Sequence, residues 1–79
     1  MIYLVSLLFG VVLISMPLPD TSLADCREIA AASQSAIDAK LAVRPGAHGG
    51  KVVTVGDLEV VCSYIPPVEG KPLTQGTPA

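Results

Sequence analysis

The longest uncharged stretch of the chain lies at its N-terminus, where residues 2–16 are almost all apolar. Pro17 and Pro19 follow this stretch, and proline disrupts the interior of a helix. A helix that spans a membrane needs about 20 apolar residues, whereas the core of a signal peptide needs about 7 to 15. The pattern therefore predicts an N-terminal signal helix.

A cleavage site for this signal peptide follows the prolines. Ser22 and Ala24 are small residues on either side of Leu23, and signal peptidase accepts small side chains at these two positions. We predict cleavage between Ala24 and Asp25, so that residues 1–24 form the signal peptide. The segment before the apolar run has no Lys or Arg, and an uncleaved N-terminal membrane anchor is the alternative.

The residues around this site also bear on lipidation. The sequence of residues 23–26, Leu-Ala-Asp-Cys, resembles the bacterial lipoprotein box, a short apolar stretch that ends in small residues and a lipidated cysteine. The resemblance implies lipid attachment at Cys26. It covers four residues and departs from the pattern at Asp25, where that family has Gly, Ala or Ser.

The polarity pattern changes to a helical one after residue 25. Residues 26–43 are rich in helix-forming residues, and apolar side chains recur on one face at helical spacing. Asp25 and Glu28 have the spacing of a capping box at the first turn. Pro45 disfavours helical geometry in the residue before it. We therefore expect one short helix that ends before Pro45.

The next apolar stretches have the alternation of strands. Residues 51–55 and 58–65 are separated by Gly56 and Asp57, a two-residue turn typical of hairpins. The resulting register places Cys62 on the face that packs against the helix. The opposite face carries three apolar side chains, and we predict a partner surface there, made of Val52, Val61 and Ile65.

These elements define an α+β fold class. We expect the N-terminal signal helix, then one short helix packed on a two-stranded antiparallel hairpin in a mini-domain of residues 25–65. Residues 66–79 contain four prolines and two glycines. Such a composition with few apolar anchors predicts a disordered C-terminal tail.

Two cysteines, Cys26 and Cys62, follow the predicted cleavage site. Disulfides persist in oxidising compartments outside the cytosol, so we predict an internal bond, with intermolecular pairing as the alternative. The predicted hairpin makes this bond difficult to reach. A helix over residues 26–43 is about 27 Å long, and Cys62 is expected near its opposite end.

Composition and charge exclude several classes of protein. The chain is 51% hydrophobic, but much of this lies before residue 25, and the remaining 55 residues have no Phe or Trp. A buried cofactor pocket of roughly 300 Å³ or more is not expected in so small a core. The net charge is -2, without the clustered Lys and Arg that nucleic acid or anionic lipid requires.

Candidate chemistry is sparse. His48 is the only histidine, and no spacing typical of a metal site is present. The loop from Pro45 to Lys51 lacks the glycine and hydroxyl positions of a phosphate-binding P-loop, although its amides with Arg44 and Lys51 could form a looser anion site. We expect no catalytic residues, no metal and no cofactor.

The sequence thus predicts a secreted or periplasmic protein that is not an enzyme. Our first hypothesis is a noncatalytic binding or accessory module with an unknown protein partner in the envelope or outside the cell. The second is a membrane-tethered small subunit of an envelope complex, held by residues 1–24. A small secreted toxin or inhibitor is the third.

Overall fold

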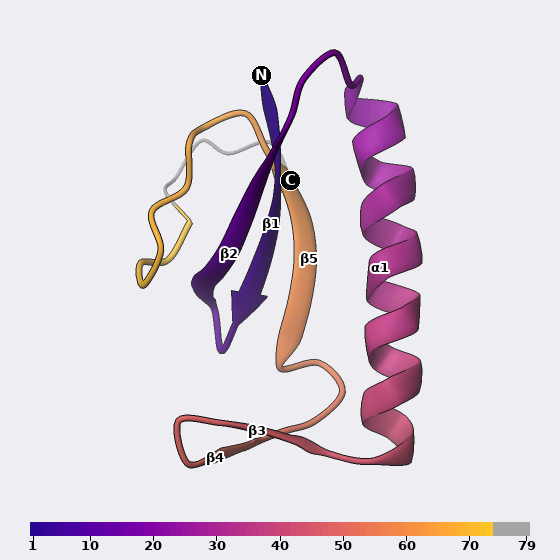
Figure 1. Cartoon of the computed structure of the whole chain (residues 1–79), viewed down its shortest axis with the longest axis vertical. Coiled ribbons are helices and arrows are strands. Elements are labelled where there is room, and N and C mark those ends of the chain that lie inside the picture. Colours follow the sequence, from indigo (N-terminus) through magenta and orange to yellow (C-terminus); the bar gives the residue numbers. More distant parts are fainter. Residues whose placement is uncertain (74–79) are drawn as a thin grey trace.

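The computed structural model describes residues 1–73. It contains one helix and five strands, and the fold is α+β with antiparallel sheets, as predicted (Figure 1). In chain order the elements are β1 (Ile2–Leu8), β2 (Val11–Leu18), α1 (Leu23–Val43), β3 (Gly46–His48), β4 (Lys51–Val53) and β5 (Leu58–Ser63). A three-stranded sheet has the order β2-β1-β5, and β3 and β4 form a separate two-stranded sheet.

The prediction of an N-terminal signal helix is wrong for this structure, because residues 2–18 form the β1–β2 hairpin. Phe9 and Gly10 make the turn with φ angles of 52° and 79°, the combination that a two-residue hairpin turn requires. A short apolar run fits a buried strand as well as a helix. The strands are stabilised here because β1 has a neighbouring strand on both sides.

Half of the buried apolar residues come from this hairpin. Among the described residues, the buried apolar side chains are Ile2, Val5, Leu8, Val12, Cys26, Ala30, Val53 and Cys62. Ile2 belongs to one cluster with the two cysteines and Ala30. The N-terminal segment therefore contributes to the same core that the disulfide crosslinks.

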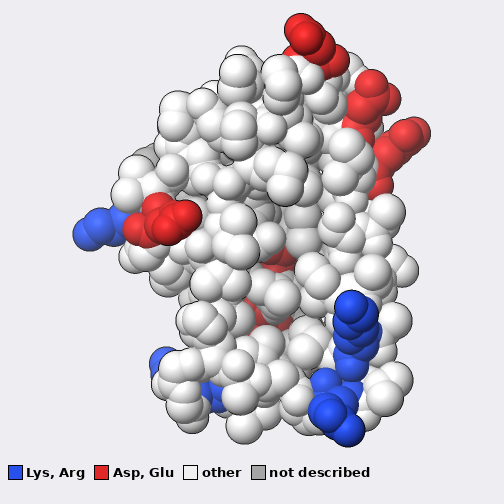
Figure 2. Space-filling view, viewed as in Figure 1, with Lys and Arg blue, Asp and Glu red and all other residues white. Residues whose placement is uncertain are grey.

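The helix begins earlier than predicted. Ser22 is its N-cap, and the Ser22 hydroxyl accepts a hydrogen bond of 3.1 Å from the Asp25 backbone N–H. Asp25 thus lies inside the first turn rather than capping it. Figure 2 shows acidic groups near the start of α1 and basic groups near its end, where Asp25 and Lys40 lie in the first and last turns. Both signs of charge suit the helix dipole.

We expect Ser22→Ala to lower the free energy of unfolding by about 1 kcal/mol, because a backbone N–H of the first turn loses its acceptor. Ser22→Asp keeps an acceptor at the cap and should retain most of the stability. Urea unfolding of the full-length chain measures both changes. Equal losses in the two variants would show that the cap bond does not stabilise α1.

The predicted hairpin of residues 51–65 is also not formed. Strand β4 pairs with β3 across a turn at Gly49 and Gly50, and β5 pairs with β1 over six residues. The Asp57 carboxylate accepts hydrogen bonds from the backbone N–H and the hydroxyl of Thr54. This closed turn separates β4 from β5, and β5 gains a longer and entirely uncharged partner in β1.

The segment after β5 contains no helix or strand as far as Leu73, in keeping with the predicted tail. Part of it nevertheless lies along the outer edge of β2 (Figure 1). The Gly70 N–H donates to the Val12 carbonyl, and the Val12 N–H donates to the Lys71 carbonyl. The predicted tail extends to residue 79, and residues 74–79 lie outside the described part of the chain.

Candidate functional site

Strand β5 contacts both the helix and the rest of the three-stranded sheet. It lies between β1 on one edge and helix α1 on the other (Figure 1). Because β5 runs antiparallel to α1, its C-terminal end returns to the beginning of the helix. This arrangement removes the difficulty of joining Cys62 to Cys26 that the predicted hairpin created.

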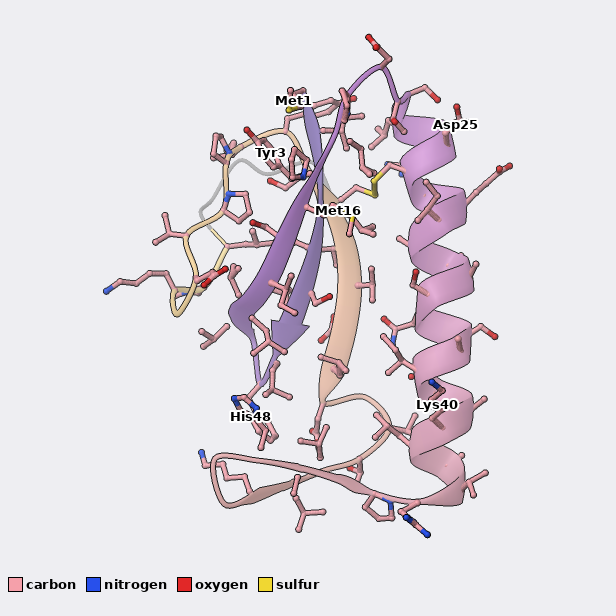
Figure 3. The ribbon with its side chains drawn as sticks, viewed as in Figure 1. Met1, Tyr3, Met16, Asp25, Lys40 and His48 are labelled. Carbon is pink, nitrogen blue, oxygen red and sulfur yellow. A yellow bond between two sulfur atoms is a disulfide. The ribbon has the colours of Figure 1, made fainter. Side chains whose placement is uncertain are left out.

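The predicted disulfide between Cys26 and Cys62 is present, and its two Cα atoms are 6.3 Å apart. This separation lies in the ordinary range for disulfides. Cys26 is fully buried and Cys62 is 4% exposed. Figure 3 shows the bond joining α1 to β5 near the start of the helix. The crosslink therefore fixes the strand against the helix from within the core.

A side-chain amide satisfies two backbone groups on the outer edge of β5. Gln34 donates from Nε2 to the Leu58 carbonyl over 2.8 Å and accepts at Oε1 from the Val60 N–H over 2.8 Å. It thereby takes the place of a peptide group in a neighbouring strand. Gln34 Nε2 also donates to Asp38 Oδ1, which orients the amide. An exposed strand edge can pair with other chains, and Gln34 occupies the part of this edge at Leu58 and Val60.

Loss of this amide has a measurable expected cost. We expect Gln34→Ala to lower the free energy of unfolding by about 1 to 3 kcal/mol, because two part-buried backbone groups lose their partner. Ser35 follows Gln34 and is exposed, so Ser35→Ala should change the free energy of unfolding by less than about 0.5 kcal/mol. Thermal and urea unfolding measure the difference. Equal stability of the two variants would contradict the role assigned to Gln34.

The inner edge of β5 pairs with β1 over six residue pairs, from Tyr3↔Ser63 to Leu8↔Leu58. We call the place that Ile2–Leu8 occupies beside β5 the β1 slot. At its centre, Val5 lies opposite Val61 and is completely buried. The slot offers backbone hydrogen-bonding groups along one side and an apolar interior. It suits an extended, uncharged segment.

The three residues of the predicted partner surface do not share one hairpin. Val52 lies on β4, pairs with Ala47 and is 64% exposed. Val61 lies on β5 opposite Val5, and Ile65 follows the strand. Both are only partly exposed. The structure therefore places Val52 and Val61 in different sheets and Ile65 outside both, because β4 and β5 do not pair with each other.

The two residues of the predicted cleavage site, Ala24 and Asp25, are exposed and lie in the first turn of α1. The cleavage itself stays a prediction. The neighbouring Cys26 carries the disulfide, so its sulfur is not available for the lipid that the resemblance to the lipoprotein box implies.

A hollow with a volume of about 590 Å³ lies beside the β1–β2 turn. Its walls come from the β1–β2 turn, the β3–β4 sheet and residues 69–70. The Lys51 ammonium lies 5.4 Å from the centre of the Phe9 ring, a cation–π contact. His48, labelled in Figure 3, also lines it. The N-terminal hairpin forms one wall of this hollow, which is open to solvent and is not a buried pocket.

Sequence reasoning missed both β1 and Gln34 as partners of β5. A signal for Gln34 was its position on the flank of an alanine-rich helical face, where a long amide can reach an adjacent strand.

Among residues 1–73, no three side chains of His, Cys, Asp or Glu gather in a group that could hold a metal ion. Within the same residues, no helix combines the length and apolar character needed to cross a membrane.

Comparison of the chain with protein-family models, curated proteins and solved structures finds no match. The class of protein therefore follows from the geometry: a small α+β chain in which helix α1 is joined by a disulfide to an antiparallel sheet.

Proposed function

We propose that the chain is an exported protein, processed after Ala24, that acts as a noncatalytic binding or accessory module in the periplasm or outside the cell. The Cys26–Cys62 disulfide carries this proposal. Disulfides form and persist in oxidising compartments and are rare in the cytosol. Both cysteines follow Ala24, so the crosslink survives the processing step.

The N-terminal segment supports export through its uncharged apolar run and the small residues before the cleavage bond. In the folded full-length chain this bond lies inside the first turn of α1. Proteolysis favours exposed, flexible segments, so a bond within a helical turn is a poor substrate. Processing therefore takes place before α1 forms, while the chain is still being translocated.

The consequence of processing supports binding rather than catalysis. Removal of residues 1–24 takes away both β1 and β2, and with them Ile2, Val5, Leu8 and Val12 from the core. The inner edge of β5 then has no neighbouring strand. Apolar surface of this kind is typical of an interaction site, and a partner that covers it restores the lost contacts.

The experiment that tests this proposal is the intact mass of the protein purified from its native host, with and without reductant. The proposal predicts the mass of residues 25–79, lighter before reduction by the two hydrogen atoms lost in the disulfide. A full-length mass would contradict processing. A mass that reduction does not change would contradict the oxidised state on which the assigned compartment rests.

A further inference from the structure

We propose that the processed chain accepts an apolar β-strand of a partner protein in the β1 slot, as the antiparallel neighbour of β5. The inference rests on the proposed function, since the slot becomes free only when residues 1–24 have been removed. The full-length structure shows which kind of segment fits, because it seats Ile2–Leu8 there. The leader thus occupies the position in which the partner binds.

The backbone of β5 favours an extended occupant. The Leu58 carbonyl and the Val60 N–H point outward to Gln34. By the alternation of an antiparallel ladder, Glu59, Val61 and Ser63 therefore direct their backbone groups towards β1. These groups lose their partners when β1 is removed. Unpaired backbone groups at a sheet edge are best satisfied by another strand, whereas the backbone groups along the interior of a helix are already bonded to one another.

The side chains of β1 define what the occupant must carry. The burial of β1 is highest at three evenly spaced positions, Ile2, Val5 and Leu8, which are 5%, 0% and 8% exposed. Ile2 packs in the cluster that contains the disulfide. A charge at the position of Val5 would be buried without a partner, which is strongly unfavourable. The slot therefore selects a strand that is uncharged and apolar at these three positions.

Part of the wall of the slot is held by residues outside the hairpin that fills it. The disulfide and the Gln34 hydrogen bonds both join α1 to β5, and all these residues follow Ala24. They hold β5 in place on its outer side while leaving its inner edge untouched. These bonds occupy the outer edge of β5. A partner strand is therefore directed to the inner edge.

The test uses the full chain with a protease recognition sequence inserted in the β2–α1 connection after Asp20. Cutting there leaves every part of the fold present, with the hairpin held only by noncovalent contacts. The probe is a fluorescent peptide of residues 1–18 with a solubilising lysine extension. Its incorporation is followed by anisotropy and native mass spectrometry, in moderate urea to release the resident hairpin. A matched peptide carries Val5→Asp, and a control peptide carries Ile14→Asp at a position that is 57% exposed.

We expect the unchanged and Ile14→Asp peptides to replace the hairpin, and the Val5→Asp peptide to bind at least about tenfold more weakly, a difference of about 1.4 kcal/mol. No exchange, or equal exchange of all three peptides, would overturn strand acceptance. Dimers of the uncut chain that exchange hairpins would assign the slot to a second copy and would also overturn the proposal. A full-length mass from the native host would instead contradict processing, so the two proposals fail separately.

Discussion

Val5→Asp is expected to unfold the full-length chain or to lower its free energy of unfolding by about 3 to 5 kcal/mol, the cost of an unpaired buried charge. Val5 is 0% exposed and lies in the central strand of the sheet, between Ser15 on β2 and Val61 on β5. Neither neighbour offers a positive charge. Circular dichroism and urea unfolding of the oxidised protein measure the effect.

The matched control is Ile14→Asp on the adjacent strand β2. Ile14 is 57% exposed, so its carboxylate stays in water and the free energy of unfolding should change by less than about 0.5 kcal/mol. If both variants are equally tolerated, residues 2–18 do not contribute to the core as described. If both are equally destabilising, burial does not distinguish the two positions.

Loss of the disulfide is expected to have the second large effect. The variant with Cys26→Ser and Cys62→Ser should lose about 4 kcal/mol of stability, from the entropy of the unfolded chain freed when a loop of this length is no longer closed. The sequence separation of the two cysteines is 36 residues. Small proteins depend on such crosslinks because their cores are limited.

Urea unfolding of this double variant, compared with the oxidised and the reduced wild-type chain, measures the contribution of the bond. The reduced wild type and the double variant should agree to within about 1 kcal/mol, since both lack the crosslink. A double variant as stable as the oxidised protein would contradict the structural role of the disulfide. It would also weaken the argument that places the protein in an oxidising compartment.

The helix and the disulfide could be predicted from the sequence. The helix depends on local composition, and the disulfide depends on the number of cysteines. Alanine-rich composition and Pro45 indicated where α1 lies, although Ser22 rather than Asp25 caps it. Only two cysteines are present, so a single internal pairing was available. The fold class α+β followed from the helical and strand-like segments without knowledge of which strands pair.

The pairing of the strands could not be predicted because it depends on distant segments. Residues 2–16 show no clear periodicity, and a central strand that is covered on both faces has none to show. Gly56 and Asp57 indicated a turn, and a turn is present there. The turn leads from β4 into a different sheet, however, because Asp57 closes it with Thr54 and β1 provides a longer partner for β5.

The candidate site was missed for the same reason. With residues 1–24 set aside as a leader, β5 had only residues 51–55 as a predicted neighbour, and Val61 was assigned to a solvent-facing surface. In the structure Val61 lies opposite Val5. The exposure of a strand residue depends on its neighbouring strand, and the sequence of β5 does not identify that neighbour.

The measurement that tests the β1–β5 pairing most directly is a nuclear Overhauser spectrum of the oxidised full-length chain. Gln34 bonds the outward groups of Leu58 and Val60, so the pairs Leu4↔Cys62 and Ser6↔Val60 are the closely spaced, non-hydrogen-bonded ones. We predict strong contacts between the Hα atoms within each pair. Their absence, with sequential amide–amide contacts typical of a helix along residues 2–16, would contradict the slot and the binding role built on it.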